Sequence, residues 1–420
     1  MKIGHISFRL AGTDGVSLET AKLVKVLRKM GHTNYYFAGE LDAPDASIAP
    51  IDGTYYVPLA HFTHPKIVSI SNEAFGNDQP CPNLHKKINR IASQLEDELT
   101  NFIQIFKIDL ITVQNVFSIP MNLALALATY RFIKKTNIPV INHNHDFYWE
   151  RNKYLKNCVN DLLEEIFPPN LENIQQVVIN SQSQRTLLEK GIESTILPNI
   201  FDFENDPPGI DEFNSDLRDN LGIRASELFF LQPTRVIPRK GIELSIELVS
   251  RLSDLPIKLV ITHKAEHDTQ DYLNQIQNLA KEKKVDLIYK PEIFEPTRRM
   301  LSDNSKIYSL WDAYIHSDFI TYPSLYEGFG NALLEMMYFK KPFLINRYQV
   351  FKDDIEPKGI KAVKFDGKIN DQVADEVRKL IRNPQIIADY VDANTKIGKK
   401  YYSFQTAQET LEKILINLST

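Results

Sequence analysis

The sequence has little cysteine, little net charge and no long apolar run. Only two of its 420 residues are cysteine, Cys81 and Cys158. Two cysteines are too few for a disulfide framework, and they do not have the spacing of zinc ligands, so the sequence is typical of a protein in the reducing cytoplasm. A formal net charge of -5 argues against nucleic acid as the main partner, because a phosphate backbone requires a basic surface. No window approaches the roughly 20 apolar residues that span a bilayer, and no charged leader precedes the first apolar run. We therefore expect a soluble cytoplasmic protein without an integral membrane segment.

Short apolar runs alternate with segments of helical periodicity along most of the chain, which predicts βαβ units and parallel sheets. The length exceeds what one ordinary core accommodates, so we expect an α/β protein with two Rossmann-like domains facing each other across a cleft. Residues 41–80 are rich in Pro, Asp, Gly and Asn, and we expect no regular element there. The predicted strands cover residues 2–8, 32–39, 109–114, 139–143, 176–180, 194–198, 228–233, 257–262, 286–290, 318–322, 342–346 and 361–365.

Residues 201–215 (FDFENDPPGIDEFNS) have few apolar residues that could pack, two prolines and a run of acids, which is typical of a linker. We therefore expect one domain over residues 1–200 and a second over residues 216–403. The tail from residue 404 has the periodicity of an amphipathic helix.

The stretch YPSLYEGFGNALLE, residues 322–335, joins an apolar strand to a helix through a glycine-bearing turn. A helix N-terminus behind such a turn offers backbone N–H groups and a dipole to an anion. Glu327 on the turn suits sugar hydroxyls, and Glu335, one helical turn beyond Asn331, can accept hydrogen bonds from a ribose. Two solvated glutamates are the simpler interpretation, but the surrounding pattern favours half of a nucleotide-sugar site.

Two further loops follow predicted strands. The sequence QPTRVIPRKG, residues 232–241, places Arg235 and Lys240 ahead of a helix, where positive charge can stabilise a diphosphate leaving group. The turn from Gly12 to Gly15 follows the first strand and opens a helix, so its N–H groups can hold the same diphosphate. Its spacing is not that of a GxGxxG dinucleotide fingerprint.

The sequence HNHDFYWER, residues 143–151, stands at the end of a predicted strand, where sites form in parallel sheets. Its aromatic side chains suit sugar rings, and its arginine suits a phosphate or a carboxylate. We do not expect the two histidines to bind a metal, because no third ligand has a suitable spacing. The chain also has no Asp-x-Asp pair to hold a diphosphate through a cation, so we expect no obligatory metal and no need for Mg²⁺.

Together with Leu197-Pro198-Asn199, these motifs resemble a retaining glycosyltransferase of family 4 over nearly the whole length of the chain. The resemblance implies the GT-B fold, with two facing Rossmann-like domains, a central cleft and a C-terminal helix that crosses back to the N-terminal domain. It implies that residues 1–200, with the helix at 404–420, bind the acceptor and that residues 216–403 bind a nucleotide sugar. The sequence departs from the family at the turn from Gly12 to Gly15, which usually reads Gly-Gly, and at residues 261–264 (ITHK), which often read Gly-x-Gly.

The same resemblance implies roles for individual side chains. The expected catalytic residues are His145, Arg235, Lys240 and Glu327. The expected donor-binding residues are Gly15, Arg235, Lys240, Ser324, Glu327, Gly328, Phe329, Gly330, Asn331 and Glu335. The expected acceptor-binding residues are Arg9, Thr13, Asp14, His143, Asp146, Tyr148, Trp149 and Arg151.

The implied reaction moves a hexose from a GDP-, UDP- or ADP-sugar to a hydroxyl group of a small acceptor by front-face transfer. The amphipathic segment 84–106 mixes Lys and Arg with Glu and Asp, which favours a soluble acceptor, such as a sugar bearing a phosphate or carboxylate, over membrane docking. A nucleotide-sugar 2-epimerase and a non-catalytic nucleotide-sugar-binding module are the alternatives. A glycoside hydrolase fits less well, because its two carboxylates flank the scissile bond. The sequence does not indicate an oligomeric state.

Overall fold

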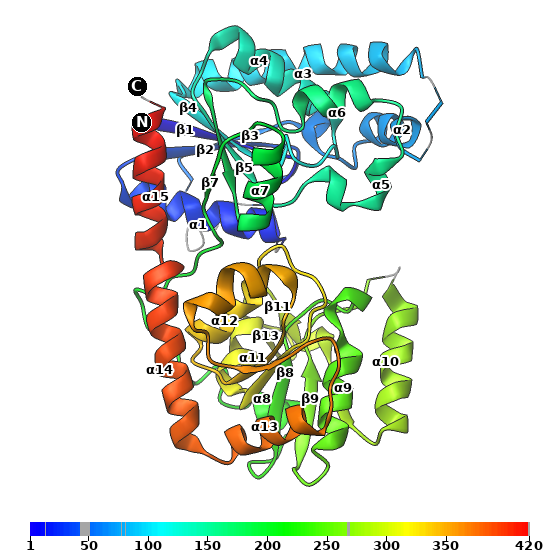
Figure 1. Ribbon diagram of the computed structural model, residues 1–420, viewed down its shortest axis with the longest axis vertical. Helices are drawn as coiled ribbons and strands as arrows, with labels where there is room; N and C mark the ends of the chain where they lie inside the picture. Colours follow the sequence, from blue (N-terminus) through cyan, green and yellow to red (C-terminus); the bar gives the residue numbers. More distant parts are fainter. Residues whose placement is uncertain (13, 43–50, 77, 80, 267–268, 419–420) are drawn as a thin grey trace. The chain divides into compact units, whose positions relative to one another are not determined.

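The computed structural model describes residues 1–420 except 13, 43–50, 77, 80, 267–268 and 419–420 (Figure 1). The chain forms two compact units, one of Met1–Ile200 with Phe404–Thr420 and one of Phe201–Ser403. Residues 201–215, where we expected a linker, are counted with the second unit.

The first unit is built on a seven-stranded parallel sheet in the order β3-β2-β1-β4-β5-β6-β7. Its strands are β1 (Lys2–Ile6), β2 (Thr33–Ala38), β3 (Gly53–Tyr56), β4 (Leu110–Gln114), β5 (Val140–Asn144), β6 (Ile174–Val178) and β7 (Ser194–Ile196). The strand order reverses beside β1, which pairs with both β2 and β4. In a sheet of this kind the loops at the carboxyl ends of the strands form the ligand site.

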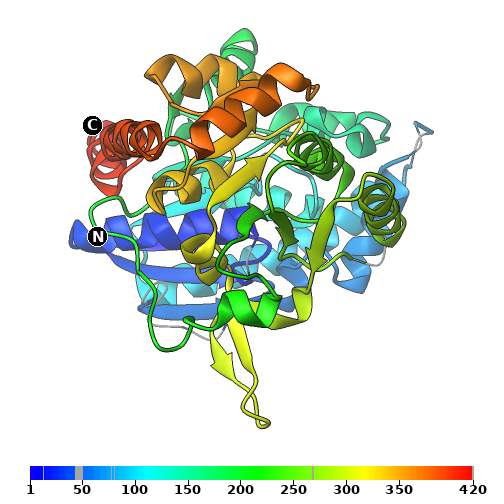
Figure 2. The ribbon, with the colours of Figure 1, turned by 90° about the horizontal axis from the view of Figure 1, so that it is seen from below.

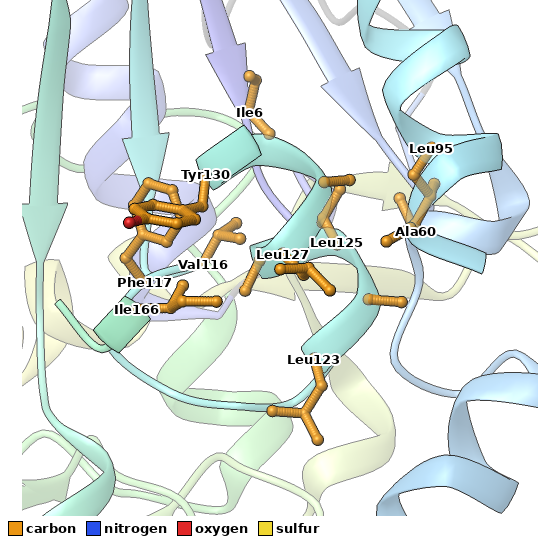
Figure 3. Packing of buried hydrophobic residues seen from close by; sticks show 14 of the residues in the cluster. Ile6, Ala60, Leu95, Val116, Phe117, Leu123, Leu125, Leu127, Tyr130 and Ile166 are labelled. Atoms are coloured by element: carbon orange, nitrogen blue, oxygen red, sulfur yellow. The ribbon is translucent and has the colours of Figure 1, made fainter. Parts of the chain in front are cut away.

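Helices cover the first sheet, and the apolar faces they bury form its core. They are α1 (Gly15–Lys29), α2 (Pro65–Ala74), α3 (Leu84–Phe106), α4 (Leu123–Thr136), α5 (Asn152–Leu155), α6 (Asn160–Ile166), α7 (Ser181–Glu189) and α15 (Phe404–Asn417). Figure 3 shows α4 placing Leu123, Leu125 and Leu127 among buried residues that include Phe117. The C-terminal helix α15 buries Leu411 in a separate cluster with residues of α1, β1 and β4–β6.

The second unit is built on a six-stranded parallel sheet in the order β10-β9-β8-β14-β15-β16. Its strands are β8 (Leu228–Gln232), β9 (Ile257–Ile261), β10 (Asp286–Tyr289), β14 (Phe319–Tyr322), β15 (Phe343–Asn346) and β16 (Val363–Phe365). Its helices are α8 (Leu217–Leu221), α9 (Ile242–Arg251), α10 (Gln270–Glu282), α11 (Leu310–His316), α12 (Asn331–Tyr338), α13 (Asp371–Ile381) and α14 (Pro384–Tyr401). Because β8 lies between β9 and β14, the loops that follow these three strands are neighbours.

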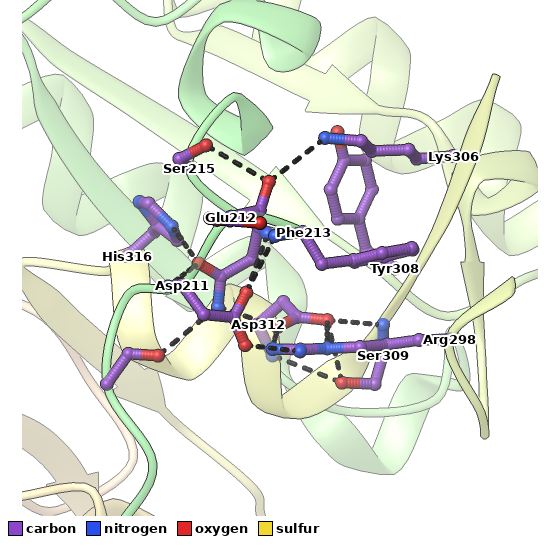
Figure 4. Close-up of polar contacts among 12 residues, drawn as sticks. Asp211, Glu212, Phe213, Ser215, Arg298, Lys306, Tyr308, Ser309, Asp312 and His316 are labelled. Carbon is purple, nitrogen blue, oxygen red and sulfur yellow. Dashed lines mark hydrogen bonds and ion pairs between the residues drawn. The ribbon is translucent and has the colours of Figure 1, made fainter. Parts of the chain in front are cut away.

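Polar contacts hold residues 211–215 against the second unit (Figure 4). Arg298 reaches Asp211 at 2.6 Å and also donates to the buried carboxylate of Asp312. Asn214 donates to the same carboxylate at 2.9 Å. This segment is therefore a packed part of its unit.

The prediction that residues 41–80 lack regular structure is wrong for the described part of that range. β3 joins the edge of the first sheet and α2 contributes Ile67 and Ile70 to the core. Sequence reasoning also missed the small sheet of β11 (Phe294–Glu295), β13 (Lys306–Ser309) and β12 (Arg299–Met300), whose hairpin projects from the second unit (Figure 2). No helix in the described ranges has the length and hydropathy needed to cross a bilayer.

Candidate donor and acceptor sites

The loops that follow β8 and β14 meet at the carboxyl edge of the second sheet. The backbone N–H of Leu325 donates to the carbonyl oxygen of Arg239 at 2.8 Å. Gly241 has φ +61°, and a Cβ there would lie 2.7 Å from the carbonyl oxygen of Pro323. A glycine at this position therefore allows the two loops to approach closely.

A buried carboxylate joins these two loops. Glu327 forms ion pairs with Lys240 and, at 3.1 Å, with Arg239. The side chains of Glu327 and Lys240 are 8% and 12% exposed, whereas that of Arg239 is 40% exposed. The Lys240 pair is therefore shielded from solvent, and the Arg239 pair lies at its rim.

The electrostatics of this cluster keep Glu327 ionised. Burial alone would raise the pKa of Glu327, but the charges of Lys240 and Arg239 outweigh it and lower the pKa below its usual value. Burial lowers the pKa of Lys240, with the charges of Arg239 and Arg235 acting in the same direction and Glu327 opposing them. The neighbouring Ser324 hydroxyl is buried without a well-formed hydrogen bond, although it lies close enough to help lower the pKa of Glu327.

Arg235 and His263 extend the site across the ends of β8 and β9. Arg235 is exposed, and its charge lowers the pKa values of both Lys240 and His263. Burial, followed by the charges of Lys240 and Arg235, lowers the pKa of His263 to about 4, so its ring is neutral at pH 7. This edge of the sheet therefore gathers the positive charges of Arg235, Arg239 and Lys240, which is the kind of charge that a diphosphate requires.

The helix α12 begins after a glycine whose backbone has a positive φ. Gly330 has φ +107° and precedes Asn331, the first residue of the helix. A Cβ at Gly330 would lie 2.7 Å from the Tyr348 hydroxyl, which donates to the carbonyl oxygen of Phe329 at 2.6 Å. Gly328 and the N-terminus of α12 follow Glu327 closely in the chain, so both lie near the cluster that Glu327 forms. One helical turn further on, Glu335 accepts a hydrogen bond from Tyr314 at 2.8 Å.

In the first unit, the predicted histidines lie at the end of β5. The rings of His143 and His145 are 4.2 Å apart, and the Nε2 atom of each is buried without a hydrogen-bond partner among the described residues. Burial, followed by the charge of Lys22, lowers the pKa of His145 to about 4, although the residue keeps some surface in contact with solvent. Burial, with His145 as a further cause, also lowers the pKa of His143 well below its usual value. Both rings are therefore neutral at pH 7.

The loop after His145 satisfies most of its polar groups internally. Asn115, at φ +61° after β4, accepts from the His145 N–H and donates to Asp146, both at 2.8 Å. The other oxygen of Asp146 accepts from Nε of Arg151 at 2.9 Å. The predicted acceptor residues Asp146 and Arg151 are thus paired with each other.

The aromatic residues of this loop also pack on the protein. Trp149 stacks on Phe147 with ring centroids 4.4 Å apart and planes 5° apart. The ammonium group of Lys190 lies 4.8 Å from the Trp149 ring centre, and Tyr148 meets the edge of that ring at 5.1 Å. Much of the indole surface is therefore already covered.

The turn after β1 carries the remaining predicted residues. The carboxylate of Asp14 caps α1 by accepting from the N–H groups of Val16 and Ser17 at 3.1 and 3.3 Å, next to Gly15 at the start of the helix. Nε of Arg9 lies 3.3 Å from Asp14 in a geometry that forms no hydrogen bond. Thr13 lies outside the described residues.

Sequence reasoning missed several residues of these sites, namely Arg239, Tyr348, Asn115 and Lys22. The position of Asn115 directly after a strand that neighbours β5 is the signal that could have identified it. Arg239 adjoins Lys240 in the same basic run, whereas nothing in the sequence near Tyr348 or Lys22 points to the site. Across the described chain, no three His, Cys, Asp or Glu side chains form a group that could hold a metal ion.

The topology of the two sheets is that of the GT-B glycosyltransferases, as solved structures show. A sucrose-phosphate synthase from Thermosynechococcus elongatus matches with TM-score 0.67 and 14% identity, covering 99% of this chain and 98% of that one. Anabaena HepE in complex with UDP and glucose matches with TM-score 0.65 and 13% identity over 99% of each chain. Both likenesses concern the fold alone.

Sequence comparison identifies the family. A family model described as "Glycosyl transferases group 1" matches residues 213–400. A mannosylglucosylglycerate synthase from Petrotoga mobilis is 36% identical over 88% of this chain and 87% of its own length. Another from Thermotoga maritima is 30% identical over 98% of this chain and 99% of its own. The chain belongs to the group 1 glycosyltransferases and is a glycosyltransferase enzyme.

Proposed function

We propose that this enzyme transfers a mannosyl group from GDP-mannose to a hydroxyl group of glucosylglycerate, giving mannosylglucosylglycerate. The observation that carries the proposal is the similarity, over nearly the whole chain, to two synthases named for that product. The name of the product implies a mannosyl donor and a small, anionic sugar acceptor. This matches the basic donor loop and the soluble acceptor that the sequence favours.

In this proposal the second unit binds the donor. Arg235 and Lys240 neutralise the diphosphate, and the N-terminus of α12 adds the dipole of its backbone. Glu327 accepts hydrogen bonds from the sugar hydroxyls, and its ion pairs with Lys240 and Arg239 keep the Lys240 ammonium group in position. Glu335 receives the ribose hydroxyls, with Tyr314 holding its carboxylate.

The reaction that fits these residues is front-face transfer with retention of configuration. The acceptor hydroxyl forms a bond to the anomeric carbon on the face from which the diphosphate leaves, and the leaving phosphate oxygen takes the hydroxyl proton. Arg235 and Lys240 stabilise the negative charge that develops on the phosphate. His145 is neutral at pH 7, so it acts on the sugar as a hydrogen-bonding group and not as a cation.

Because side-chain cations supply the positive charge, the proposal includes no obligatory metal. Mannosyl transfer in the presence of excess EDTA is expected to keep the rate measured without the chelator. Loss of transfer that returns with Mg²⁺ or Mn²⁺ would contradict this part of the proposal.

The first unit binds the acceptor, and Arg9 is our candidate for its carboxylate. Arg151 is bound to Asp146 through a hydrogen-bonded ion pair, whereas the ion pair of Arg9 with Asp14, at 3.3 Å, includes no hydrogen bond at Nε among the described residues. Replacing Arg9 by alanine should raise KM for glucosylglycerate by roughly tenfold or more, the scale of one charge-assisted hydrogen bond, and leave KM for GDP-mannose unchanged. With glucosylglycerol, which has no carboxylate, Arg9→Ala should perform like the wild type. A loss that is equal for the two acceptors would assign Arg9 another role.

The test of the proposed function is a matrix of donors and acceptors. GDP-mannose, UDP-glucose and an ADP-hexose are each supplied with glucosylglycerate, with its phosphorylated form, or alone, and products are followed by mass and by NMR of the anomeric centre. We expect an α-linked mannosyl product from GDP-mannose and glucosylglycerate. The phosphorylated acceptor is included because a mannosylglucosyl-3-phosphoglycerate synthase from Petrotoga mobilis is 28% identical over 71% of this chain and 60% of its own length. Conversion of the donor alone to an epimer would favour the alternative 2-epimerase, and binding without turnover would favour a non-catalytic module.

A further inference from the structure

The two cysteines of the chain, 77 residues apart in sequence, lie against the same backbone carbonyl. The Sγ atoms of Cys81 and Cys158 are 3.6 and 3.5 Å from the carbonyl oxygen of Glu73. Glu73 is in the last turn of α2, where carbonyl groups have no partner within the helix and accept other donors. Both sulfur atoms therefore lie around one oxygen atom, although Sγ of Cys81 is also 3.3 Å from the carbonyl oxygen of Gln79. Burial raises the pKa of Cys158, and the two thiols are close enough for that of Cys81 to raise it further.

The backbone fixes both cysteines in this arrangement. The N–H of Cys158 donates to the carbonyl oxygen of Ala74 at 3.0 Å, and Gly76 donates to Lys156 at 2.8 Å. These bonds pair the end of α2 with the segment that precedes α6. Cys81 is held from the other side, because its carbonyl oxygen accepts from the N–H of Leu84 at the start of α3. Both side chains remain partly exposed, so a small reagent can reach them.

We propose that Cys81 and Cys158 form a reversible intramolecular disulfide, which ties the loop between β5 and α6 to the connection between α2 and α3. The proposal does not depend on the identity of the donor or acceptor. The loop after β5 carries Asp146, Trp149 and Arg151, so the disulfide would close one end of the segment that includes the predicted acceptor residues.

The chemistry is thiol–disulfide exchange with a low-molecular-weight disulfide as the oxidant. The Cys81 thiolate attacks one sulfur of that disulfide, forming a mixed disulfide and releasing one thiolate. The Cys158 sulfur then attacks Sγ of Cys81 and releases the second thiolate, and the two protons lost by the cysteines end on the two released thiols. We assign the first attack to Cys81, because burial, together with the neighbouring Cys81 thiol, raises the pKa of Cys158 to about 11.

The experiment treats the full-length protein, without reductant, with oxidised glutathione. We expect the mass to fall by about 2 Da as two hydrogen atoms leave, with no retained adduct and with the Cys81 and Cys158 peptides cross-linked. Dithiothreitol should restore both thiols. A protein that keeps two glutathione adducts, or that forms disulfide-linked dimers, would overturn the proposal.

Two comparisons, one between single-cysteine variants and one between buffer and urea, test whether the fold itself favours the disulfide. Cys158→Ser should stop at one stable glutathione adduct on Cys81, whereas Cys81→Ser should react slowly because its remaining thiol is protonated. In the wild type, closure of the mixed disulfide should be at least about tenfold faster in buffer than in concentrated urea, because the fold raises the effective concentration of one thiol near the other. Equal rates in the two solvents would show that the native structure does not bring the cysteines together.

Discussion

Replacing Lys240 by alanine removes the most enclosed cation of the candidate donor site. The side chain of Lys240 is 12% exposed and pairs with a carboxylate that is 8% exposed. The variant therefore loses positive charge where the diphosphate would leave, and it also deprives Glu327 of one of its two cationic partners. The first effect acts on the rate and the second on stability, so the two can be measured separately.

The magnitude of each effect follows from the surroundings. Loss of one preorganised group that stabilises developing charge lowers kcat by roughly 10²- to 10³-fold, equivalent to about 2.7–4 kcal/mol. Leaving a buried charge without any partner costs about 3–5 kcal/mol, but Arg239 still contacts Glu327 at 3.1 Å. We therefore expect a loss of about 2 kcal/mol in the free energy of unfolding, or roughly 4–8 °C in Tm for a unit of this size.

The assay measures kcat and KM for mannosyl transfer and, on the same samples, Tm by calorimetry. Arg239→Ala is the matched control, because it removes the other partner of Glu327 from a position that is 40% exposed. It should lower kcat by less than about tenfold and cost under about 1 kcal/mol of stability. The double variant Lys240→Ala/Glu327→Gln neutralises the carboxylate left by the first change, so it should regain Tm without regaining kcat.

Two results would refute this reasoning. An unchanged kcat in Lys240→Ala, with transfer limited by chemistry, would remove Lys240 from the stabilisation of the leaving group. Recovery of kcat in the double variant would mean that the single substitution acts by disturbing Glu327, and that the cation itself is dispensable.

Three further predictions concern stability, and each is checked by urea unfolding. Gly330→Ala should cost about 3 kcal/mol, because its φ is +107° and its Cβ would crowd a tyrosine hydroxyl, whereas Gly367→Ala, at φ +68° in open space, should cost about 1 kcal/mol. Burial lowers the pKa of His5 to about 4, so between pH 6.5 and 4 its side chain binds a proton in the unfolded chain but not in the folded one. This residue alone should lower stability by about 3 kcal/mol across that window, and His5→Gln should reduce the fall by about that amount, while the buried His143, His145 and His263 keep contributing to it. Leu411→Ala in α15 should cost about 3 kcal/mol, but Ile416→Ala, 64% exposed on the same helix, under about 0.5 kcal/mol.

The alternation of apolar runs and helical periodicity predicted both parallel sheets, because every strand buried on both faces must be continuously apolar. The elements that were missed have weaker signals. The helix α2 starts with Pro65 at its first position, a recognised start signal, but the polar residues around it hid the apolar spacing of Ile67 and Ile70. Strands of two residues, such as β11 and β12, are too short to show any period.

The residues of the candidate donor site could be proposed from the sequence because they lie in two short motifs that follow strands. The sequence could not show that Lys240 and Glu327, 87 residues apart, form an ion pair. That contact depends on β14 lying next to β8, and strand order follows from the packing of whole units. Arg239 was overlooked for the same reason, since its role appears only when the carboxylate of Glu327 is beside it.

The acceptor-binding residues were predicted from the chemistry of their side chains alone. Their contacts in the fold indicate which of them are available to bind an acceptor. Trp149 already stacks on Phe147, and its ring centre lies 4.8 Å from the ammonium group of Lys190. Its indole therefore has little free surface for stacking against a sugar ring. Arg151 is bound to Asp146 and must give up that partner before its guanidinium group can bind a carboxylate of the acceptor. The cost of desolvating the guanidinium group then opposes binding. Arg9 also pairs with a carboxylate, that of Asp14 at 3.3 Å, but the pair includes no hydrogen bond at Nε. Less is therefore lost when Arg9 turns to an anionic acceptor, and the contacts of the first unit favour it over Arg151.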